Sequence, residues 1–85
     1  MSRENVDFAS IREKIKLTRK TLELSQEQFG KRVGLRRQDV HNIETGKRQP
    51  GITVLYRIAV EYDLSLDWLV IGRAYNYFSG GHSSI

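Results

Sequence analysis

The residues best suited to chemistry lie between Lys31 and Arg48, a segment with six cations and two anions. An arginine fork can bond both acceptors on guanine, and a glutamine or asparagine amide can bond adenine through two atoms as well. The segment places such groups close together, at Arg37, Gln38 and Asn42. Their types and spacing predict contacts with the base edges of a nucleic acid. The alternative interpretation is an ordinary solvated polar face.

Two glycines and a valine predict the corner that positions these side chains. Gly30 is the small residue that two approaching helices need, Gly34 tolerates the positive φ of a tight corner, and Val40 supplies branched apolar surface on the second helix. Apolar residues recur three or four positions apart on both sides of the corner, so both helices can share one core. The pattern predicts a helix-turn-helix.

Capping residues and glycines divide the chain into five expected helices. The first covers about residues 8–22, with an apolar stripe at Phe8, Ile11, Ile15 and Leu22. The second begins after Ser25, which forms a capping box with Gln28, and ends near Val33. The others cover about residues 37–45, 52–62 and 66–71, and Gly46 and Gly72 end the first and the last of these. The 52–62 helix is expected to pack on the others through Ile52, Leu55, Ile58, Ala59 and Tyr62. No segment alternates as a strand would, so we expect an all-α fold, a compact five-helix bundle.

The chain divides by composition into an arm at residues 1–7, a helix-turn-helix domain at 8–72, and an aromatic then Gly/Ser-rich tail at 73–85. A length of 85 residues suits one small core. The first 48 residues carry twelve Lys and Arg against seven Asp and Glu, whereas the rest carry two against three, so the positive charge belongs to the front half.

With no cysteine, no leader-like segment and no apolar run of about 18 residues, we expect a cytoplasmic protein without a membrane span.

Several motifs in order resemble the XRE/Cro family of helix-turn-helix DNA-binding domains, the lambdoid phage repressor and Cro type, over about residues 11–72. The matching pieces are Ser25-Gln26-Glu27, Gly34, Ile43-Glu44-Thr45-Gly46-Lys47, Pro50 and Ser65-Leu66-Asp67-Trp68-Leu69. The resemblance implies a lambda-repressor-like bundle and a sequence-specific transcriptional regulator, most often a repressor, of bacterial or phage origin. It also implies a homodimer on a palindromic double-stranded DNA operator.

The resemblance assigns roles to individual residues. Base contact falls to Arg37, Gln38 and Asn42, and His41 lies on the same face. Phosphate contact falls to Gln26, Lys47 and Arg48, and Arg36 is a further candidate. Structural roles fall to Gly30, Gly34 and Val40, and to an ion pair between Arg19 and Glu44.

Three positions depart from the family pattern. Arg36 stands where a capping Ser, Thr or Asp is usual, which is expected to cost the third helix about 1 kcal/mol. Gly30 replaces the commoner Ala at an expected cost in helix propensity of up to about 1 kcal/mol. Gly51 stands where a capping Ser or Thr is usual, so the fourth helix begins less sharply.

Other functions find less support in the sequence. No nucleophile with a base, no Gly-rich phosphate loop and no metal-ligand cluster can be assembled, because His41 and His82 stand apart, so we expect neither an enzyme nor a cofactor. The main alternative is an antitoxin-type module that binds a toxin partner and autoregulates its operon. Its motivation is the aromatic tail with Tyr75, Tyr77 and Phe78, which could also fold back or support a dimer. A third possibility is the N-terminal part of a longer repressor.

Overall fold

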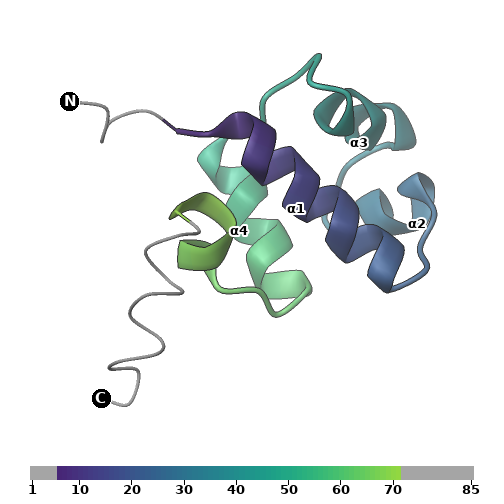
Figure 1. Ribbon diagram of the computed structural model, residues 1–85. Helices are drawn as coiled ribbons and strands as arrows, with labels where there is room; N and C mark the ends of the chain where they lie inside the picture. The colour runs from purple at the N-terminus through teal and green to yellow at the C-terminus, as the bar shows by residue number, and fades with distance from the viewer. Residues whose placement is uncertain (1–5, 72–85) are drawn as a thin grey trace.

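The computed structural model describes residues 6–71 and consists, over that range, of five helices and no strand. They are α1 (Phe8–Thr21), α2 (Gln26–Lys31), α3 (Arg37–Glu44), α4 (Ile52–Glu61) and a π-helical turn, η1 (Asp67–Ile71). Figure 1 shows α1 crossing the middle of the domain, with α2 and α3 toward one end and η1 toward the other. The predicted all-α bundle is confirmed, and within residues 6–71 no helix combines the length and apolar character needed to cross a membrane.

Helix starts follow the expected capping chemistry. Asp7 accepts the backbone N–H of Ser10 at the start of α1. Ser25 accepts the N–H of Gln28 at 3.0 Å, and the Gln28 side chain accepts the Ser25 N–H at 2.8 Å, which completes the predicted capping box. The last turn begins the same way, because the Ser65 hydroxyl accepts the N–H of Trp68. Local sequence therefore places three of the five helix starts.

The core contains residues of all five helices, and Phe29 is fully buried in it. Ile11 and Ile15 of α1 are fully buried with it, as are Ile58 and Leu69. The remaining buried apolar residues are Val33, Val40, Ile43, Leu55, Ala59 and Tyr62. Tyr62 stacks on Phe29 with 4.5 Å between ring centroids, and its hydroxyl donates to the Phe29 carbonyl at 2.8 Å. This aromatic pair thus links α2 to the residue that ends α4.

Two predicted core residues are on the surface instead. Leu22 is 49% exposed because α1 ends at Thr21, and the chain then turns so that Leu24 packs against the core in its place. Ile52 is 66% exposed, since the buried face of α4 is centred on Leu55, Ile58 and Ala59. A spacing of three or four residues fits more than one face of a helix, and only the tertiary packing selects the buried one.

Gly30 has a stricter role than the sequence predicted. A β-carbon built there would lie 2.6 Å from the Leu35 carbonyl oxygen and 2.8 Å from Val40 Cγ2. The Gly30 carbonyl also accepts the N–H groups of Val33 and Leu35, which form the turn. The alanine that is commoner in the family would therefore not fit here without a shift, because the added carbon meets backbone.

We expect Gly30→Ala to lower the free energy of unfolding by about 1–3 kcal/mol, since overpacking against a fixed carbonyl outweighs the propensity gain of up to about 1 kcal/mol. Urea unfolding measures the change. The matched control is Gly51→Ser, where a β-carbon meets open space and a capping hydroxyl should add a few tenths of a kcal/mol. A Gly30→Ala variant as stable as wild type would show that the corner can widen at little cost.

Candidate nucleic-acid interface

One side of α3 is buried and the other presents polar side chains to solvent. Val40 and Ile43 are 1% and 2% exposed and hold the helix to the core. On the outward side Arg37 and Gln38 are exposed, and His41 and Asn42 are half-buried. Because these positions are 0, 1, 4 and 5 residues along the helix, they fall within one arc of about 140°. The four predicted base-contacting residues thus share a surface.

Two of these side chains are joined by a hydrogen bond. The Gln38 amide nitrogen donates to the Asn42 amide oxygen at 3.1 Å, one helical turn away. The Asn42 NH₂ and the Gln38 oxygen take no part in this bond. The pair therefore presents one amide as donor and the other as acceptor, which is the combination that the adenine edge requires.

Asp39 organises the start of α3 in place of a capping residue at Arg36. Its carboxylate accepts the Arg36 backbone N–H at 3.0 Å, and the Arg36 side chain makes no cap bond, as expected for an arginine. The same carboxylate accepts Arg36 Nε at 3.4 Å and Arg48 Nη1 at 3.1 Å. These bonds from Arg36 and the charges of both arginines hold the pKa of Asp39 below its ordinary value. The expected loss at this helix start is thus partly offset.

The loop after α3 folds back on the helix that it follows. Gly46 has a positive φ of +84°, which agrees with its predicted role as the glycine that ends the helix. The Arg48 backbone N–H donates to the Asn42 carbonyl at 3.1 Å, which satisfies one free carbonyl of the last turn. The guanidinium of Arg12 lies against Gly46, so an α1 cation joins Lys47 and Arg48 in this region. No pattern in the sequence pointed to Arg12, because only tertiary packing brings α1 here.

Glu44 connects three elements beneath this surface. It accepts Arg19 Nε at 2.7 Å and Arg19 Nη2 at 3.0 Å, and Arg19 also donates to the Leu24 carbonyl. Gln26, the first residue of α2, donates its amide to the same carboxylate at 3.1 Å. The Gln26 side chain, predicted to contact phosphate, is thus also tied to the ion pair. The last polar side chain of α3 thereby fixes the start of α2.

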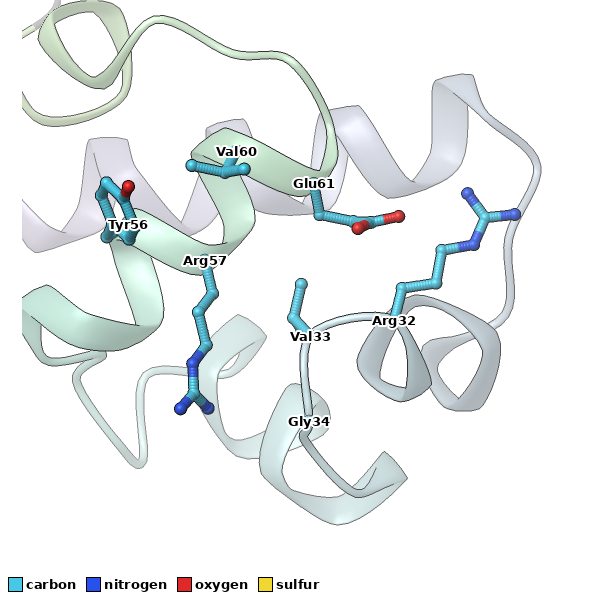
Figure 2. Close-up of a pocket in the computed structure, with 7 residues that line it drawn as sticks. All are labelled: Arg32, Val33, Gly34, Tyr56, Arg57, Val60 and Glu61. Atoms are coloured by element: carbon cyan, nitrogen blue, oxygen red, sulfur yellow. The ribbon is translucent and has the colours of Figure 1, made fainter.

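A hollow of about 360 Å³ lies between the corner and α4, away from the α3 polar face. Figure 2 shows Arg57 extending from α4 toward Gly34, with Arg32 and Glu61 at the other end and Val33 between the two elements. Gly34 has φ +77°, the predicted left-handed corner, and Arg57 Nη1 lies near it. Tyr56 and Val60 form an exposed apolar rim. His82 and the tail aromatics lie outside the described residues.

Comparison with known proteins agrees with this architecture. The sequence model of the helix-turn-helix family matches residues 15–69. A curated "Uncharacterized HTH-type transcriptional regulator" from Archaeoglobus fulgidus is 33% identical over 61 residues, which cover 72% of this chain and 86% of that protein.

Two solved structures are similar over nearly their whole length. The P22 c2 repressor, crystallised with synthetic operator 9T, has a TM-score of 0.67 and 27% identity over 73% of this chain and 94% of its own. The restriction-modification controller protein C.AhdI from Aeromonas hydrophila has a TM-score of 0.67 and 25% identity over 74% and 96%. The chain therefore belongs to the XRE-type helix-turn-helix family of DNA-binding transcriptional regulators.

Proposed function

We propose that this protein is a repressor that binds a palindromic operator as a homodimer and contacts base edges in the major groove through α3. The observation that carries the proposal is the single polar face of Arg37, Gln38, His41 and Asn42, with Arg36, Lys47 and Arg48 on the exposed surface at either end of the helix. Helix side chains of these types match the donor and acceptor pattern of the major groove. The flanking cations can neutralise DNA phosphates. Each neutralised phosphate steepens the slope of log affinity against log salt concentration by about 0.9. A protein with this role acts in the cytoplasm.

Selection of bound duplexes from a random library tests this function. We expect enrichment of an inverted repeat, because two recognition helices of a dimer enter successive major grooves about 34–36 Å apart. Fluorescence anisotropy then compares the selected duplex with random DNA at about 0.15 M ionic strength. Equal affinity for both duplexes would reject sequence-specific regulation.

The exposed side of α4 supports the dimer. Ile52, Tyr56 and Val60 follow one another at one-turn intervals, and each is more than half exposed. Beside them Arg57 and Glu61 are also one turn apart, so a two-fold axis crossing α4 between them would set Arg57 against the partner's Glu61. The same patch on both copies is what a symmetric dimer requires.

We expect Val60→Asp to weaken self-association at least about tenfold, because the dimer would then bury an unpaired carboxylate. Sedimentation equilibrium over a concentration series measures the mass. The matched control, Leu17→Asp, places the same charge at an exposed apolar residue of α1 and should leave the mass unchanged. A Val60→Asp variant that remains as dimeric as wild type would exclude the α4 surface.

An antitoxin-type interaction module is the second candidate, and the feature that favours it is the aromatic tail with Tyr75, Tyr77 and Phe78. Purification of the tagged full chain from its host, beside a chain that ends at residue 72, separates the two functions. A single stoichiometric partner that requires the aromatic tail would support the antitoxin. Absence of a partner in both preparations, or the same partner in both, would count against it.

A further inference from the structure

We propose that Asp39 is a positioning residue for DNA binding, which holds the guanidinium groups of Arg36 and Arg48 as a prearranged phosphate clamp. This inference rests on the proposed function in that its ligand is DNA. It concerns the phosphate backbone, however, and not the base sequence. A carboxylate on a DNA-facing helix would by charge alone repel the ligand, so its presence there needs a physical reason beyond the bond to the Arg36 backbone N–H.

The geometry supplies that reason. Arg36 precedes α3 and Arg48 follows it, nine residues after Asp39, yet both guanidinium groups bond one carboxylate at 3.4 and 3.1 Å. The Asp39 side chain is only 16% exposed, whereas those of Arg36 and Arg48 are 86% and 43% exposed. The carboxylate thus lies beneath two cations whose outer edges face solvent.

Each arginine retains donors for a phosphate while it is held. A guanidinium has five N–H groups, and Asp39 uses one nitrogen from each arginine, Nε of Arg36 and Nη1 of Arg48. Long side chains lose rotamer freedom when they bind a ligand, and part of that loss has already occurred in the free protein. Guanidinium groups held in fixed positions also bind the DNA phosphates in one position relative to the protein, which aligns α3 with the groove.

The decisive variant is Asp39→Asn, because charge and positioning predict opposite signs. The asparagine oxygen can still accept the Arg36 backbone N–H, so the start of α3 is kept while the charge that holds both arginines is lost. The net charge rises by one, which by itself would strengthen binding to any duplex. Loss of positioning is expected instead to weaken binding to a random-sequence duplex about tenfold. It should also reduce the slope of log affinity against log salt concentration by about 0.9 to 1.8, which corresponds to one or two phosphate contacts.

Three comparisons make the experiment decisive. Glu13→Gln removes an exposed carboxylate from α1 and should bind as wild type does or slightly better. Arg48→Ala should lower the slope, and Asp39→Asn added to it should cost clearly less than in the wild-type background, because half of the clamp is already absent. Circular dichroism and thermal unfolding confirm that each variant folds.

Binding by Asp39→Asn equal to or tighter than wild type, with an unchanged or steeper salt slope, would overturn the inference. Additive losses in the double variant would overturn it too. Since random-sequence DNA is the ligand, a failure of sequence preference would reject the proposed repressor without altering this result.

Discussion

Replacement of Arg19 by alanine should lower the free energy of unfolding by about 3–5 kcal/mol. The Glu44 side chain is 3% exposed and that of Arg19 12%, so the variant leaves a buried carboxylate with only the Gln26 amide as a side-chain partner. A domain of this length has roughly 4–13 kcal/mol of stability in total. The variant should therefore be close to unfolding at 37 °C. Urea unfolding followed by Trp68 fluorescence measures the loss.

Lys20→Ala is the matched control, because it removes an exposed cation from the same turn of α1 and should change stability by less than about 0.5 kcal/mol. A loss below about 1 kcal/mol for Arg19→Ala would place the ion pair among surface bridges, which contribute little. Such a result would mean that Glu44 reaches water when its partner is removed.

The pH dependence of stability gives a second test of the same ion pair. Burial alone raises the pKa of Glu44, but hydrogen bonds from Arg19 and Gln26 and the charges of Arg19 and Lys16 outweigh it and hold the pKa below the ordinary 4.5. A lowered pKa contributes stability above pH 4.5 that is lost as the pH falls through the folded-state value. In Arg19→Ala, the effect of burial prevails and the pKa of Glu44 rises above its ordinary value. The pH dependence is then reversed, and Glu44 should lower the free energy of unfolding as the pH increases.

The sequence was sufficient where local chemistry decides the structure. The Ser25 and Gln28 capping box and the positive φ of Gly34 and Gly46 each depend on residues within a few positions of one another. The family motifs then supplied the order of the helices. Four base-contacting candidates share a face because helical periodicity alone sets their directions.

What the sequence did not predict depends on contacts between distant elements. The sequence around Asp39 does not predict that Arg48 will contact it from the loop after α3. The tight approach at Gly30 depends on where the Leu35 carbonyl falls after the turn. Ile52 matched the apolar period of α4 but lies on its free side, and the last helix is a π-helical turn where an ordinary short helix was expected. Spacing defines possible contacts, and packing selects among them.

The largest expected effect on function belongs to the Gln38 and Asn42 amides. We expect Gln38→Ala to weaken binding to the selected operator about 5- to 150-fold, which corresponds to the 1–3 kcal/mol of discrimination that a good two-point base contact gives. Affinity for random DNA should stay the same, because the residue carries no charge and neutralises no phosphate. Anisotropy titrations on both duplexes measure the two affinities.

The hydrogen bond between these amides adds a sharper expectation. Because Gln38 donates to Asn42 at 3.1 Å, removal of either side chain frees the other to rotate, and Asn42→Ala should lose much of what Gln38→Ala loses. The double variant should then lose clearly less than the sum of the two single variants. Additive losses would mean that each amide contacts DNA independently. An operator affinity unchanged by Gln38→Ala would instead place base recognition on Arg37 and its neighbours, since the amide pair would then lie outside the groove.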